Sequence, residues 1–237
     1  MNLVQVVGAA PATTIPEVVG RLRAIESALP ATDGVSWFTK LYLAVTEAVG
    51  EAVVPGGFRD PAFLAQLDVA FANLFFDALR RATHDPGSTP KAWAPLIEAR
   101  AERRIAPIQF AFAGMNAHIN RDLPIALVST CELAGVDLDD AAPQHVDFDQ
   151  VNSLLKATES RVKAWFATGF LELADAALGD VDDRIAMWDI ERAREAAWVQ
   201  PQTLWALRSL PDLRARYLVT LDHVVGFAGR GLLVPAT

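Results

Sequence analysis

Residues 63–79 read FLAQLDVAFANLFFDAL and residues 108–122 read IQFAFAGMNAHINRD, and these two stretches decide the fold. When each is placed on a helix with a period of about 3.6 residues, apolar side chains cover nearly every side. A helix that is apolar all round lies in the middle of a bundle, where neighbouring helices cover it. The sequence therefore predicts two buried central helices, Phe63–Leu79 and Ile108–Asp122.

Helix signals also mark the chain before the first central helix. A first amphipathic helix follows Pro16, which suits a first turn, and Asp33 is expected to cap a second helix over about residues 35–49. The dipeptide Asp60–Pro61 combines an N-cap residue with proline at the first helical position, which is a strong start signal.

Further helices are expected downstream. One begins near Lys91 and continues to Asp122, with a kink at Pro107, because proline cannot donate the regular hydrogen bond. A short helix follows from Pro124 to about Leu133. The remaining expected helical segments cover about 149–178, capped by Asp149, and 182–198, with two more that begin at Pro201 and Pro211 and reach about Gly229.

The sequence contains no internal repeat, no low-complexity tract and no strand-like alternation longer than a few residues. A length of 237 residues suits one domain. The fold class predicted is therefore all-α. We expect a single helical domain over residues 1–237, built as a bundle of about eight helices, two of which are buried in the centre.

Composition limits the function classes. Hydrophobic residues make up 52% of the chain, which excludes disorder, and the net charge of -8 gives no electrostatic reason to bind nucleic acid or an anionic membrane. No charged region precedes the apolar N-terminus, and no run reaches the roughly 18 apolar residues of a membrane span. Cys131 is the only cysteine, so no internal disulfide can form. A cytoplasmic protein is expected, and a homodimer is left open.

Polar residues interrupt both central helices. Burying a carboxylate or amide costs several kcal/mol unless it is hydrogen-bonded or neutralised, so such residues indicate a cap, a network or a site. The first helix carries Asp68, Asn73 and Asp77, and the last two are four apart and share a face. The second carries His118 with Asp122 and Asn116 with Asn120, again as pairs four residues apart.

The pair His118 and Asp122 supports two kinds of chemistry. The two groups could bind one metal ion, or Asp122 could orient the imidazole for proton transfer. The alternative is structural, because Asp122 stands before Leu123 and Pro124 and could cap the next helix.

Other residues could complete such a site. Asp77 could act as a second acid or base, since an apolar setting raises a carboxyl pKa. Asn73, Asn116, Asn120 and Tyr42 could orient a substrate, although Asn73 and Asp77 could equally form a polar network between helices, and Asn116 could bind a backbone.

One loop carries further candidates. His145 and Asp147 are expected to lie extended in the loop before Asp149, where they could reach the mouth of a site.

Several catalytic motifs are absent from the sequence. It contains no G-x-S-x-G, P-loop, G-x-G-x-x-G or H-E-x-x-H pattern. It also lacks E-x-x-H, which a carboxylate-bridged di-iron bundle would need twice.

Residues 113–124, AGMNAHINRDLP, resemble the signature of an uncharacterised bacterial family, common in actinomycetes, that is classified as a domain of unknown function. Residues 71–77, Asp33–Gly34 and residues 147–152 also resemble its pattern, so the likeness spans nearly the whole chain. The resemblance implies no established activity. His118-x-x-x-Asp122 also resembles the H-x-x-x-D of helical zinc phospholipases and nucleases, but four histidines are too few for their trinuclear site.

Three functions follow as hypotheses. The first is a cofactor-independent cyclase, isomerase or lyase for an apolar small molecule, with His118, Asp122 and Asp77 as the catalytic residues. The second is a hydrolase that depends on a divalent metal bound by the same three side chains. The third is a non-catalytic helical binding or interaction protein.

Overall fold

The computed structural model describes residues 6–8, 10–53, 57–139, 142–151 and 199–235, and within these ranges it contains helices and no strand. The predicted all-α fold class is therefore confirmed. The helices are α2 (Ile15–Ala28), α3 (Gly34–Val53), α4 (Pro61–His84), η1 (Pro86–Ser88), α5 (Ala94–Ala99), α6 (Pro107–Ala117), η2 (His118–Asp122), α7 (Leu123–Ala134), α11 (Val199–Ala206) and α12 (Pro211–Leu232).

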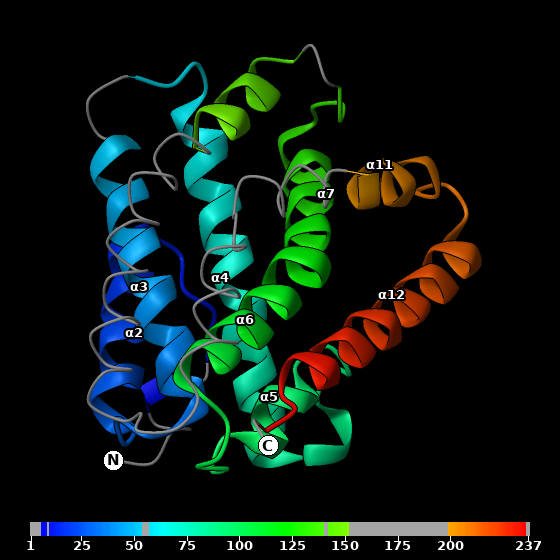
Figure 1. The fold of residues 1–237 in the computed structure, drawn as a ribbon. Coiled ribbons are helices and arrows are strands. Elements are labelled where there is room, and N and C mark those ends of the chain that lie inside the picture. Colours follow the sequence, from blue (N-terminus) through cyan, green and yellow to red (C-terminus); the bar gives the residue numbers. More distant parts are fainter. Residues whose placement is uncertain (1–5, 9, 54–56, 140–141, 152–198, 236–237) are drawn as a thin grey trace.

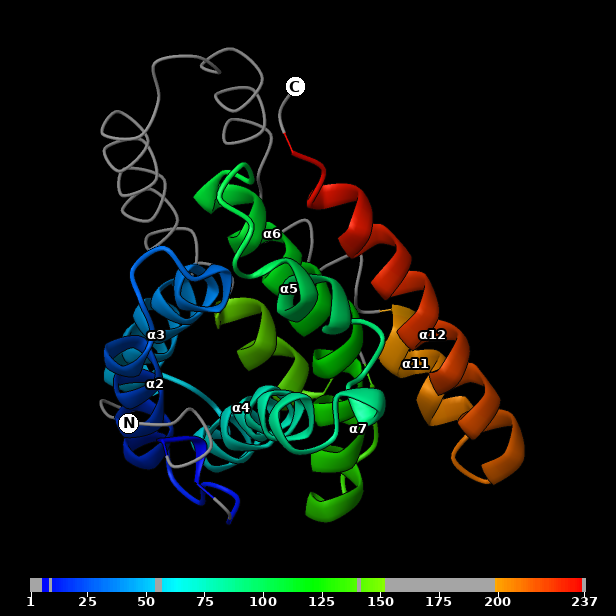
Figure 2. The ribbon, with the colours of Figure 1, turned by 90° about the horizontal axis from the view of Figure 1, so that it is seen from below.

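Helices α4 and α6 lie in the centre of the molecule, as Figures 1 and 2 show. Helices α2 and α3 pack together on one side, and α3 also packs on α6. Helix α7 continues from α6 through η2 and packs on α4, while α12 crosses α6 and α5 on the other side. Eight of the eleven residues of α6 are buried, as its apolar sequence predicts.

Two of the predicted helix starts, those at Asp60 and Asp33, are confirmed by their hydrogen bonds. Asp60 accepts the Phe63 N–H at 3.0 Å and so caps α4, and Asp33 accepts the Val35 N–H at 2.9 Å at the start of α3. These bonds satisfy N–H groups that have no partner inside their own helix.

Two local predictions are wrong. Helices α5 and α6 are separate, and Pro107 begins α6 rather than kinking a continuous helix. The residue before a proline avoids the helical region, and Ala106 is extended, with φ -68° and ψ 144°.

The second correction concerns residues 143–151, which are helical, so His145 and Asp147 are not extended and Asp149 is no N-cap. Asp147 is fully buried and accepts the N–H groups of Arg59 and Asp60, at 2.8 and 2.6 Å. It therefore secures the start of α4. The expected helices over 152–178 and 182–198 lie outside the described residues.

Helix α4 has the length and composition to cross a membrane. The core helix of a soluble protein passes the same test, and one face of α4 packs in the core through Phe75, Phe76 and Leu79. The expectations on membrane, partners and localisation stay predictions.

Helices α3 and α6 approach each other closely at two glycines. A Cβ atom at Gly114 of α6 would overlap the ring of Phe38, and one at Gly34, the first residue of α3, would overlap the ring of Phe110. Both rings are buried, so neither has free space to move into. This close approach places α3, with Tyr42, directly against the end of α6.

The substitution Gly114→Ala tests this packing. We expect it to lower the free energy of unfolding by about 1–3 kcal/mol, because a methyl group forced into a filled core displaces its neighbours. Gly20→Ala in α2 is the matched control, since a Cβ there meets nothing within 4 Å and alanine favours helix. If urea unfolding gives the same free energy of unfolding for Gly114→Ala and Gly20→Ala, the close approach of α3 to α6 at Gly114 is contradicted.

Candidate functional site

The chain widens into a π-turn at His118–Asp122, where α6 passes into α7. There the Leu123 N–H donates to the His118 carbonyl, five residues earlier. Pro124 explains the widening, because it lacks an N–H and its ring would clash with the Asn120 carbonyl in a regular α-helix. Such turns inside helices are frequent at functional sites.

The carboxylate of Asp122 is completely buried and has three side-chain partners. Its Oδ2 accepts the indole N–H of Trp93 at 2.9 Å and lies 3.2 Å from Nδ1 of His118. Its Oδ1 accepts Nη1 of Arg121 at 2.5 Å. A buried carboxylate with these donors is neutralised and fixed in position.

Arg121 connects this carboxylate to α12. Its Nε donates to Asp222 at 2.9 Å, and Asp222 also accepts the backbone N–H groups of Lys91 and Ala92, at 2.7 and 3.1 Å. Burial opposes the charge of Arg121, but the carboxylates of Asp122 and Asp222 raise its pKa above the ordinary value. Arg121 therefore stays cationic and holds the π-turn, α12 and the segment before α5 together.

The imidazole of His118 is enclosed by aromatic rings. Phe71 stacks on it with 3.5 Å between ring centroids and 7° between planes, and Tyr42 contacts it edge to face at 4.4 Å. Three more rings lie farther off: Phe38 at 5.6 Å, Trp93 at 5.9 Å and Phe75 at 6.3 Å. Burial among these rings lowers the pKa of His118, although Asp122 acts in the opposite direction. The ring is therefore neutral at pH 7.

In a neutral imidazole one nitrogen carries the proton and the other a lone pair. We assign the proton to Nδ1 of His118, because that atom faces the Asp122 carboxylate. The other nitrogen, Nε2, is buried and has no hydrogen-bond partner in the described structure. It is therefore a free base inside an apolar environment.

Two hydroxyl groups of α3 share this condition. Neither Tyr42 Oη nor Thr46 Oγ1 makes a hydrogen bond of normal geometry within the described residues, and both residues are buried. Burial raises the pKa of Tyr42 well above 10, the negative charges of Asp68 and Asp122 act in the same direction, and the nearby Thr46 hydroxyl acts in the opposite direction. Tyr42 therefore stays protonated and can donate.

Asp68 of α4 is the fourth residue with an unpaired buried atom. The residue is partly exposed, but its Oδ2 is buried without a partner, and burial raises the pKa of the carboxyl to about 7. Asp68 precedes Phe71 and Phe75 by about one and two helical turns, so it shares the face of α4 that packs on His118. It is close enough to Tyr42 to raise the pKa of the phenol.

The structure does not bring Asp77 and Asn73 to this cluster, contrary to the hypothesis. Asp77 follows Phe75 by about 200° around the helix, and it forms ion pairs with Arg80 at 2.9 Å and Arg81 at 2.6 Å. Burial raises the pKa of Asp77, but Arg80 and Arg81 lower it by more, so the pKa is below its ordinary value. The carboxylate is therefore no proton donor at pH 7.

Asn73 and Asn116 bind backbone instead of facing His118. Asn73 accepts the Ala12 N–H at 2.8 Å and donates to the Ala12 carbonyl at 2.9 Å. Asn116 donates to the Val225 carbonyl of α12 at 2.9 Å and accepts Nδ2 of Asn120 at 3.1 Å. For Asn116 this is the alternative that the sequence left open.

The structure does not bring together the three side chains that the metal-binding hypothesis requires, His118, Asp122 and Asp77. His118 and Asp122 already bind each other, and Asp77 faces elsewhere. Among the residues that the structure describes, no group of three His, Cys, Asp or Glu side chains could hold a metal ion.

Sequence reasoning missed Trp93, Arg121 and the role of Asp68. The spacing of Asp68, Phe71 and Phe75 at i, i+3 and i+7 does place all three on one face of a helix. No sequence signal connects Trp93 to Asp122, because their contact depends on the path of the loop before α5.

Comparison with known proteins gives one match. The sequence model of a family described as "Family of unknown function (DUF5995)" matches residues 15–235. No curated protein and no solved structure matches the chain.

The substitution Asp68→Asn tests the environment of this carboxyl. The raised pKa means that the folded state holds a proton that the unfolded state releases, so stability falls as pH rises from about 4 to about 7. Asparagine removes this dependence. We expect the gain in unfolding free energy from Asp68→Asn to be larger at pH 8 than at pH 5, by about 2 kcal/mol. Urea unfolding at both pH values measures it, and an equal effect at both would mean that Asp68 is well solvated.

Proposed function

The chain belongs to this family of unknown function, and we propose that it is an enzyme that moves protons on an apolar small molecule, with His118 as the base. One observation carries the proposal. The Nδ1 edge of His118 is held by a fully buried carboxylate, while Nε2 is left unpaired, as are three further buried polar atoms of α3 and α4. Buried polar atoms without partners are rare in folded proteins and call for an explanation.

The arrangement divides the acid and base roles. Nε2 of His118 takes a proton from the substrate, and Asp122 stabilises the imidazolium that forms. Asp68, with a pKa of about 7, is partly protonated at neutral pH and returns a proton elsewhere on the substrate. The Tyr42 hydroxyl donates a hydrogen bond to an oxygen that gains charge.

These roles suit an isomerisation, a cyclisation or an elimination, because each proceeds when one proton leaves and another arrives. Asp68 takes the place that the sequence hypothesis gave to Asp77. Phe71 covers the imidazole but is itself partly exposed, so a rotation of its side chain would open a route to His118.

A non-catalytic role is the competing proposal. The close stacking of Phe71 on His118 favours it, because a ring packed in this way contributes to the core whether or not it reacts.

Profiling of a small-molecule extract tests the two proposals against each other. Purified wild-type protein and His118→Gln are incubated with a metabolite extract, and products are followed by mass spectrometry with chromatographic separation. We expect wild type to form a product of unchanged mass, or of a mass reduced by a small neutral molecule. We expect His118→Gln to do so at least about 100-fold more slowly, because general base catalysis contributes about that much.

His223→Gln is the matched control, since His223 is exposed on α12 and its Nδ1 lies 2.8 Å from the Val219 carbonyl. It should convert substrate as wild type does. Equal conversion by wild type and by folded His118→Gln, or conversion by neither, would refute the acid–base proposal.

A further inference from the structure

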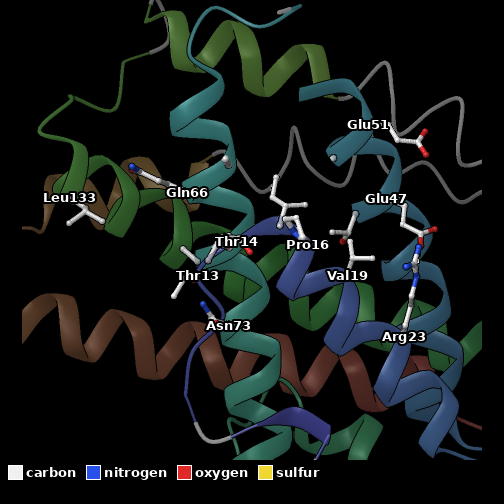
Figure 3. A pocket seen from close by; sticks show the side chains of 16 residues that line it. Thr13, Thr14, Pro16, Val19, Arg23, Glu47, Glu51, Gln66, Asn73 and Leu133 are labelled. Carbon is white, nitrogen blue, oxygen red and sulfur yellow. Dashed lines mark hydrogen bonds and ion pairs between the residues drawn. The ribbon is translucent and has the colours of Figure 1, made fainter. Parts of the chain in front are cut away.

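A groove of about 1010 Å³ runs between α2, α3 and α4 (Figure 3), and His118 is not among its lining residues. Its size is that of a site for a small organic molecule. Six apolar residues of α2 and α4 line it: Ile15, Pro16, Val19, Ala65, Val69 and Ala70.

One polar side chain that lines this groove lacks a hydrogen bond of normal geometry. Thr46 is fully buried, yet it lines the groove, and its Oγ1 makes no hydrogen bond of normal geometry in the described structure, although the Tyr42 hydroxyl is near it. The amide of Asn73, which also lines the groove, is occupied on both sides by the backbone of Ala12. Thr46 therefore offers a buried hydroxyl that can both donate and accept.

The charges around the groove select against anions. Glu47 and Glu51 stand on the α3 side, and the one arginine that lines the groove, Arg23, donates to Glu47 at 2.7 Å (Figure 3). A carboxylate or phosphate would meet negative potential there with no free cation among the described lining residues. A cationic head group would lose its hydration at the buried Thr46 hydroxyl, which carries no compensating charge.

We propose that this groove binds an apolar alcohol, with its chain along the walls of α2 and α4 and its hydroxyl on Thr46 Oγ1. A neutral hydroxyl matches the donor and acceptor capacity of Thr46. The proposal rests on the groove and on Thr46, and it holds whether or not His118 is catalytic. Thr46 lies beside Tyr42, so the polar end of the ligand would lie next to the cluster around His118.

Displacement of the neutral fluorescent probe N-phenyl-1-naphthylamine tests the proposal, with 1-decanol and decanoate as competitors. We expect the wild-type chain to bind the probe, and 1-decanol to displace it at a concentration at least tenfold lower than decanoate. Thr46→Val keeps the shape of the side chain and removes the hydroxyl. It should weaken the affinity for 1-decanol about fivefold, because one neutral hydrogen bond is lost. It should leave the affinity for the probe unchanged.

Ala65→Trp fills the groove and should abolish binding of probe and alcohol. Ala62→Trp is the matched control, because Ala62 is exposed on α4 and does not line the groove, and it should bind as wild type does. Circular dichroism and thermal unfolding confirm that each variant is folded.

Two results would overturn the proposal. One is probe binding that survives Ala65→Trp, and the other is an affinity for 1-decanol that Thr46→Val leaves unchanged. Stronger displacement by decanoate than by 1-decanol would equally refute the assigned ligand class. His118→Gln should bind 1-decanol as wild type does. The binding assay therefore tests the groove independently of the proposal that His118 is catalytic.

Discussion

The buried carboxylate of Asp122 is the constraint on which the centre of this molecule depends. An ionised carboxylate removed from water is costly unless donors surround it, and here the donors come from three places in the chain. Trp93 lies before α5, His118 lies one π-turn away, and Arg121 reaches on to Asp222 of α12. The requirement to neutralise one charge therefore fixes how α5, α6, α7 and α12 meet.

The same constraint gives the site its chemical character. Because Asp122 holds Nδ1 of His118, the imidazole presents Nε2 to a wall of α3 and α4 side chains rather than to water. The surroundings move two pKa values toward each other, lowering that of His118 and raising that of Asp68 to about 7. A neutral base and a partly protonated acid then coexist at one pH, as acid–base chemistry requires.

Local signals in the sequence predicted most of the architecture and only part of the site. Asp60 and Asp33 cap helices as expected, because a cap depends on residues within one turn. The i, i+4 pair of His118 and Asp122 was readable for the same reason. Asp77 was misassigned because its two arginines lie one turn further along α4, and the sequence alone does not rank surface pairing against burial. Trp93 was not predictable, since a loop brings it to Asp122 from 29 positions away.

The protonation state of His118 decides whether Asp122 prepares its imidazole as a base. Two-dimensional NMR on protein labelled with ¹⁵N-histidine, recorded at pH 7 with His118→Gln to assign the signals, distinguishes N–H nitrogens from those that carry a lone pair. We expect a neutral ring, with the proton on Nδ1 and a lone pair on Nε2. A proton on Nε2, or a doubly protonated ring, would mean that Asp122 does not prepare His118 as a base.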